Sequence, residues 1–152
     1  MRGLLLSLII CAAAAGVGWL FTSGSVETWY AGLRKPSINP PDWVFGPVWI
    51  ALYIAMALAA WLVWRQHHRA AVGGAILLYA IQLLLNVGWT AAFFGMRSTL
   101  AGLVVIGALW VAILATIIAF GHISASAFLL MIPYLLWVSF AALLNYRIWQ
   151  LN

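Results

Sequence analysis

The chain has 152 residues, of which 67% are hydrophobic and 6% are charged, and its mean hydropathy is +1.11. Soluble globular domains carry about a quarter of charged residues, so this composition excludes one and predicts a single integral membrane domain over residues 1–152. The net charge of +5 does not indicate nucleic-acid binding, because the seven Lys and Arg lie singly or in pairs at the ends of apolar runs, as membrane-boundary anchors do.

Five apolar stretches are each long enough to cross a hydrocarbon core, which takes about 20 residues. They cover residues 3–23, 43–64, 72–95, 99–120 and 126–149. The links after the second, third and fourth stretches are short and therefore predict antiparallel neighbours. We expect an all-α membrane protein, a five-helix bundle with its termini on opposite sides. Three cations on one side and four on the other leave its orientation open.

The first stretch has an alternative interpretation as a cleaved signal peptide, because Arg2 precedes the apolar run and small residues follow it at 12–15. A lipoprotein signal does not fit, since Ile10 rather than a small residue precedes Cys11. The apolar run also continues through residues 17–21, past the cleavage point. Its length favours a retained transmembrane helix.

The longest polar interruption lies between the first two helices, at residues 24–42, and we call it the lid loop. Its centre reads WYAGLRKPSINPP, in which three prolines restrict the backbone. The chain's only carboxylates, Glu27 and Asp42, lie in its first part and at its end. A connection this long and this stiff is more typical of a lid than of a tether.

Three of the expected helices carry aromatic and amide side chains on one face, as a step of 100° per residue shows. The faces consist of Trp49, Tyr53, Met56 and Ala60 on the second helix, Ala75, Tyr79, Gln82, Asn86, Trp89 and Phe93 on the third, and Tyr134, Trp137, Ala141, Leu144 and Asn145 on the fifth. With alternating helix directions, five residues of these faces lie in the half of the membrane nearest the lid loop: Trp49, Tyr53, Asn86, Trp89 and Asn145. We expect the faces to enclose one pocket beneath the lid loop.

Simpler roles compete with this interpretation. Gln82 and Asn145 are of a type that often only joins helices by hydrogen bonds, and tryptophans near helix ends usually belong to the interfacial belt. On the fourth helix a stripe of small residues predicts packing, either within the scaffold or between subunits: Ala101, Ala108, Ala112, Ala115 and Ala119.

Conventional catalysis is not indicated by the polar residues. The two acids flank the lid loop, so no buried acid pair forms, and all three histidines lie in connections on the side away from it. We therefore expect no metal site, no haem ligand in the pocket and no required cofactor. The single cysteine excludes an internal disulfide.

Four segments in order along the chain resemble the tryptophan-rich sensory protein and translocator protein family, also called the TspO/MBR or peripheral-type benzodiazepine receptor family. They are WYAGLRKPSINPP in the lid loop, PVWIALY on the second helix, QLLLNVGW with FFGM on the third, and PYLLWVSFAALLN on the fifth. The resemblance implies a multi-pass protein of a bacterial or mitochondrial outer membrane, commonly a homodimer, that binds porphyrins and related tetrapyrroles. Sterols and other lipids are further ligands that it implies.

Residues of the ligand pocket carry over from the matching motifs, and the helix faces add two more. The full set is Tyr30 and Pro41 in the lid loop, Trp49 and Tyr53, Asn86 and Trp89, and Trp137, Ala141 and Asn145. We expect a porphyrin to stack on the indoles, with its propionates near the amides and Arg34 or Lys35. Two alternatives stay open: a light- and oxygen-dependent porphyrin-degrading enzyme using Trp49 and Trp137, and a sterol-binding or scaffolding protein.

Overall fold

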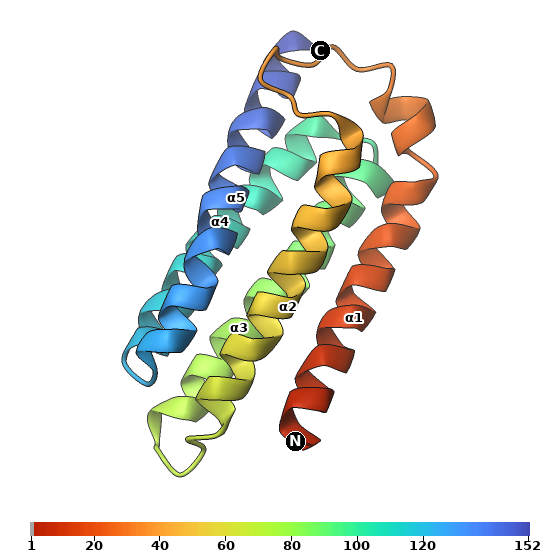
Figure 1. Cartoon of the computed structure of the whole chain (residues 1–152). Coiled ribbons are helices and arrows are strands. Elements are labelled where there is room, and N and C mark those ends of the chain that lie inside the picture. Colours follow the sequence, from red (N-terminus) through yellow and green to blue (C-terminus); the bar gives the residue numbers. More distant parts are fainter. Residues whose placement is uncertain (1) are drawn as a thin grey trace.

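The computed structural model describes residues 2–152 and consists of five long helices that run up and down (Figure 1). Their bounds are α1 Arg2–Ser23, α2 Phe45–Trp64, α3 Ala71–Thr90, α4 Thr99–Gly121 and α5 Ala125–Leu151. All five are long and apolar enough to cross a membrane. The predicted fold class is confirmed, and the amino and carboxyl ends lie at opposite ends of the bundle.

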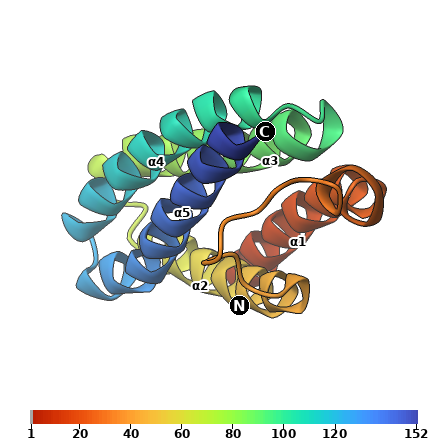
Figure 2. The ribbon, with the colours of Figure 1, turned by 90° about the horizontal axis from the view of Figure 1, so that it is seen from above.

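The helices form a ring in the order α1, α2, α5, α4, α3. The most extensive packing joins α4 to both α3 and α5, while α2 packs on α1 and α5. A smaller contact between α1 and α3 closes the ring (Figure 2). Because α4 lies on the side away from α1 and α2, it supports α3 and α5 from behind.

The lid-side ends of the second and third spans are irregular turns rather than α-helix, although the spans Asp42–Trp64 and Ala71–Gly95 keep the expected bounds to within one residue. A π-helical turn, η3 Ala91–Gly95, extends α3, and a 3₁₀ turn, η2 Asp42–Val44, precedes α2. At the starts of α4 and α5 the side chains of Ser98 and Ser124 accept hydrogen bonds from backbone N–H groups one turn on. Such caps satisfy donors that a helix leaves unpaired at its start.

The lid loop is partly helical and is tied to the bundle at two points. It begins with a π-helical turn, η1 Val26–Tyr30, and Ser25 Oγ donates a 2.8 Å hydrogen bond to the carbonyl oxygen of Phe94. Further along, the Asn152 side chain accepts from Arg34 N at 3.0 Å and donates to Arg34 O at 2.9 Å. The loop therefore lies over the bundle end as an ordered cover.

The face expected on the third helix is the buried one, since all six of its residues are less than 10% exposed. On α4 the buried stripe runs instead through Gly102, Ile106, Leu109 and Ile113. The alanine stripe of that helix lies beside it: Ala108 is exposed and the other four alanines are half-buried. Large apolar side chains on the outer surface match a bundle whose surroundings are lipid.

Candidate functional site

A cavity of about 290 Å³ lies between α1, α2, α3 and α5 beneath the first turn of the lid loop. The inward faces of α2, α3 and α5 form three of its walls, and α1 forms the fourth. No residue of α4 lines it among the described residues 2–152. The pocket is therefore at the expected end of the bundle.

Aromatic rings from α2 and α3 form the largest wall. The Trp49 ring centroid lies 6.3 Å from that of Trp89 at an interplanar angle of 31°, and 5.9 Å from that of Tyr53. Trp89 in turn stacks on Phe93 with centroids 5.8 Å apart. A continuous aromatic surface of this kind offers flat, polarisable contact area to a flat apolar ligand.

Behind this wall runs a chain of buried hydrogen bonds. Tyr53 donates to Asn86 Oδ1 at 2.6 Å, and Asn86 Nδ2 donates to the Tyr134 hydroxyl at 2.9 Å. Tyr134 then donates to Gln82 Oε1 at 2.9 Å, and Gln82 Nε2 lies 3.8 Å from Met56 Sδ. The chain fixes the rotamers of Tyr53 and Asn86, the two members that reach the pocket.

The other amides and hydroxyls of the deep walls are also paired within the protein. Trp89 Nε1 donates to Asn145 Oδ1 at 3.2 Å, and Asn145 Nδ2 donates to the carbonyl oxygen of Thr99 at 2.7 Å. The hydroxyls of Thr22 and Thr90 donate to carbonyl oxygens of their own helices. Because these groups are satisfied, the deep pocket behaves as an apolar surface.

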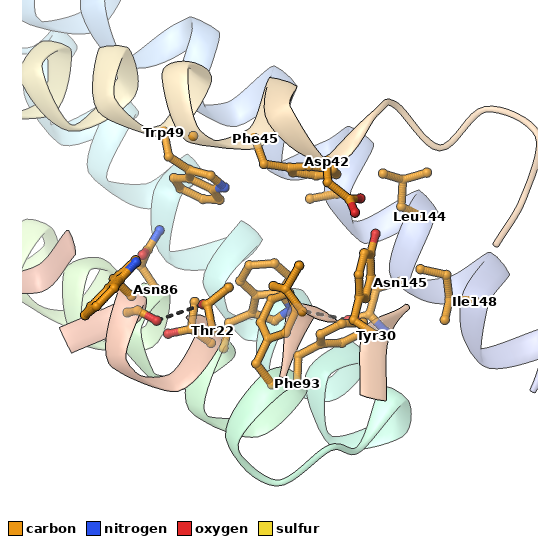
Figure 3. A pocket seen from close by; sticks show the side chains of 18 of the residues that line it. Thr22, Tyr30, Asp42, Phe45, Trp49, Asn86, Phe93, Leu144, Asn145 and Ile148 are labelled. Carbon is orange, nitrogen blue, oxygen red and sulfur yellow. Dashed lines mark hydrogen bonds between the residues drawn. The ribbon is translucent and has the colours of Figure 1, made fainter. Parts of the chain in front are cut away.

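The mouth of the pocket is polar. Asp42 and Tyr30 point toward one another across it, from the start of η2 and the end of η1 (Figure 3). Burial raises the pKa of the Tyr30 phenol, its hydrogen bond to Asn39 acts in the opposite direction, and the negative charge of Asp42 adds to the rise. Lys35 Nζ lies 4.6 Å from the centroid of the Tyr30 ring.

Of the nine residues expected in the pocket, seven line it: Tyr30, Trp49, Tyr53, Asn86, Trp89, Ala141 and Asn145. Pro41 does not, because it is the exposed residue before η2 and its neighbour Asp42 points inward instead. Trp137 does not either, because its ring packs 5.8 Å from that of Phe45, which occupies the wall in front of it. Whether the seven bind a ligand stays a prediction.

One further expectation is corrected by the geometry, and the alternatives for Gln82 and Asn145 are resolved by it. Neither Arg34 nor Lys35 lines the pocket, and Lys35 Nζ donates to the carbonyl oxygens of Ala31 and Leu33 at 3.4 Å. Gln82 belongs to the bonded chain behind the wall, whereas Asn145 both joins helices and lines the cavity. Joining helices and facing the pocket are thus combined in Asn145, whereas Gln82 only joins helices.

The wall formed by α1 was missed by sequence reasoning. Gly18, Trp19 and Thr22 line the pocket from this helix. The available signal was the series Cys11, Ala14 and Gly18, small residues three and four apart that are buried against the bundle. Other lining residues not expected there are Val26, Asp42, Phe45, Gly46, Thr90, Phe94 and Ile148.

Histidines are remote from this pocket. His67 and His68 are exposed in the connection after α2, and His122 is exposed at the end of α4. Within residues 2–152 no group of three or more His, Cys, Asp and Glu side chains is placed to hold a metal ion. The lining itself contains no His or Cys among the described residues, so the only side chains there of a type that ligates haem iron are the phenols of Tyr30 and Tyr53.

Comparisons with known proteins bear on the family of the chain. Residues 7–150 match the model of the TspO/MBR family. The chain is 48% identical to the tryptophan-rich protein TspO of Chlorobaculum tepidum over 147 residues, 94% of this chain and 91% of that protein. It is 42% identical to the translocator protein of Homo sapiens, covering 90% and 82% of the two chains. Protein CrtK of Rhodobacter capsulatus is 36% identical, with 95% and 89% covered.

Proposed function

The chain belongs to the TspO/MBR family, and from this premise together with the geometry of its pocket we propose that it binds porphyrins and related tetrapyrroles beneath the lid loop. Binding would serve a regulatory or tetrapyrrole-handling role in the membrane. The protein is an integral, multi-pass membrane protein, so its ligand can arrive from the lipid or from the lid side.

The observation that carries the proposal is an aromatic wall backed by amides and hydroxyls that are already hydrogen-bonded. Trp49, Trp89 and Phe93 present ring faces or edges along one side of the cavity. A porphyrin is a flat and largely apolar macrocycle, and it gains from stacking without breaking the hydrogen bonds of these amides and hydroxyls. Small-molecule sites are commonly of this type, mostly apolar with a few convergent polar groups.

The size of the cavity adds a condition to the proposal. Its volume of about 290 Å³ lies at the lower end of small-molecule sites, which span roughly 300–1,000 Å³. A four-ring macrocycle with its side groups exceeds the present cavity. Binding therefore requires that the lid loop shifts outward or that part of the macrocycle projects through the mouth.

The test is a titration of the detergent-solubilised protein with protoporphyrin IX in the dark, followed by tryptophan emission. Saturable quenching is expected, and Trp49→Ala should weaken affinity by up to about tenfold, since an aromatic pair contributes roughly 0.5–1.5 kcal/mol beyond its area. Trp49→Phe keeps a ring and should lose less. Trp64→Ala is the matched control, because this indole lies at the far end of α2 and is exposed. Equal, unsaturable quenching in all four proteins would refute the proposal.

A second candidate function is light-driven breakdown of the bound porphyrin with dioxygen as oxidant. The stacked indoles of Trp49 and Trp89 favour it, because electron-rich rings in contact with an excited macrocycle can exchange electrons with it. Illumination of the loaded protein should then bleach the porphyrin absorption band, and Trp49→Phe at saturating ligand should slow the loss more than Trp137→Phe. An unchanged absorption band in aerated, illuminated samples would exclude breakdown and leave porphyrin binding as the only function of the pair. Tighter saturable binding of a sterol than of any porphyrin would favour the sterol alternative.

A further inference from the structure

Asp42 is the only charged residue in the described lining of the pocket. The chain contains one other acid, Glu27, which is exposed on η1 and lies outside the lining. The cations nearest in sequence, Arg34 and Lys35, are also outside it, and the Lys35 ammonium is bonded to backbone carbonyls of the loop. Asp42 therefore carries the one formal charge of the described lining, and the Lys35 ammonium beside the Tyr30 ring lies outside that lining.

This charge lies where a ligand's polar end must be accommodated. The amides and hydroxyls of the deep walls are paired with one another or with backbone carbonyls, so they offer little to an additional polar group. At the mouth, the Asp42 carboxylate faces the Tyr30 hydroxyl (Figure 3), and that hydroxyl donates to Asn39 Oδ1 at 3.2 Å. An arriving polar group thus meets acceptors that are not matched by a free cation.

Resting on the function proposed above, we propose that Asp42 is a specificity-determining residue that selects ligands by the charge of the group they place at the mouth. The pocket takes a flat apolar molecule whose mouth-end group is neutral or cationic, and it disfavours a carboxylate there. A porphyrin with carboxylate side groups then enters by its apolar edge and keeps its carboxylate edge beyond Asp42, on the water side.

The expected size of this effect follows from Coulomb's law in a partly exposed setting. Ion pairs exposed to water contribute roughly 0–1 kcal/mol, and like charges repel by similar amounts. Removing one such repulsion changes an affinity about two- to fivefold. At 0.1 M salt the Debye length is about 10 Å, so added salt progressively weakens the interaction between exposed charges. Repulsion by Asp42 therefore predicts that a carboxylate porphyrin binds more tightly as salt is added, whereas attraction by Arg34 or Lys35 predicts the opposite.

The experiment compares three probes that share one macrocycle: protoporphyrin IX, its dimethyl ester, and its amide with two terminal amines. Each is titrated against the parent, Asp42→Asn and Glu27→Gln in the same detergent, at low and high salt. Detergent partitioning differs between probes but not between variants, so the informative quantity is how a substitution changes the ratio of two dissociation constants. Glu27→Gln removes the same charge from a position outside the lining.

Asp42→Asn should raise the affinity for protoporphyrin IX, relative to that for the ester, about two- to fivefold. It should lower the affinity for the amine probe, relative to that for the ester, by a similar factor. Glu27→Gln should change neither ratio. If added salt no longer raises the affinity of Asp42→Asn for protoporphyrin IX, the same data set would support the proposal a second time. Ratios that are identical in the parent and Asp42→Asn, or a parent affinity for protoporphyrin IX that falls with salt, would overturn charge selection while leaving porphyrin binding intact. No saturable binding of any probe would overturn both proposals.

Discussion

At the scale of single residues, Tyr134 connects the two buried amides of α3. It is 0% exposed, accepts from Asn86 Nδ2 and donates to Gln82 Oε1. Its ring also packs edge-on against Trp49, with centroids 6.3 Å apart. The hydroxyl thus holds the wall from behind without reaching the cavity, and its role is to position Asn86 and Trp49.

Tyr134→Phe should therefore destabilise the protein more than Tyr53→Phe. The first change leaves two buried amide groups without a partner, whereas the second leaves one, beside a cavity that water can enter. Unpaired buried groups cost about 1–3 kcal/mol in water-soluble proteins, but hydrogen bonds between membrane helices average nearer 0.6 kcal/mol. We expect a loss of about 1–2 kcal/mol for Tyr134→Phe and less than about 1 kcal/mol for Tyr53→Phe, measured by unfolding in mixed micelles. Equal losses would contradict the bridging role.

Residues that face inward from one helix were predictable, since a step of 100° per residue decides the face without knowledge of a partner. Asn86 and Trp89 are examples. Trp137 shows the limit of this argument: it shares a face with Ala141, yet Phe45 from another helix lies in front of it. Which of two neighbours on one face reaches a cavity depends on side chains from other helices, and a helical period contains no information about them.

At the scale of helices, α4 shapes the pocket although it contributes no residue to the lining. A Cβ atom added at Gly102 would lie 2.7 Å from Phe93 Cδ2 and 2.9 Å from Asn145 Oδ1. Both of these residues line the pocket. The absence of a side chain at Gly102 lets α4 approach closely enough for Asn145 to bond to the carbonyl oxygen of Thr99.

Gly102→Ala should accordingly displace Phe93 and Asn145, weaken the Trp89–Asn145 hydrogen bond and reduce porphyrin affinity. Overpacking costs roughly 1–3 kcal/mol, which exceeds the gain of about 1 kcal/mol in helix propensity. Gly107→Ala is the control, because a Cβ there meets nothing within 4 Å and only the propensity gain applies. The midpoint temperature of thermal unfolding in detergent should fall for Gly102→Ala and rise for Gly107→Ala. A rise for both would show that α4 accommodates the methyl group.

The contribution of α1 to the site was not predictable in the same way. This helix has apolar side chains on every side, so its sequence does not distinguish the face toward the bundle from the face toward lipid. Only the small residues at 11, 14 and 18 mark the inner face, and they indicate close packing rather than a ligand. Trp19, beside that series, lines the pocket yet is mostly exposed. Its position depends on how α1 leans against α3.

At the scale of the whole molecule, the bundle and the lid loop have separate roles. The five-helix fold and the lid-side location of the pocket follow from helix length, short links and the position of polar residues, all of which are visible in the sequence. The contacts that hold the loop are not, because they join residues far apart in the chain. Arg34 and Asn152 are the clearest case, with two hydrogen bonds between the loop backbone and the end of α5.

These two bonds should control how fast a ligand enters and leaves. Entry by outward movement of the loop is tested by Asn152→Ala, which removes the side chain that holds Arg34. Because hydrogen bonds contribute about 0.5–1.5 kcal/mol each, the loss of both should make opening roughly 5- to 150-fold easier. Association and dissociation of protoporphyrin IX should both accelerate by that factor, with little change in the dissociation constant.

Gln150→Ala is the matched control, since Gln150 bonds only to Tyr146 and Arg147 on its own helix. Stopped-flow quenching measures both rates. Unchanged rates in Asn152→Ala would mean that the ligand enters between the helices from the lipid, and that the loop is a fixed cover.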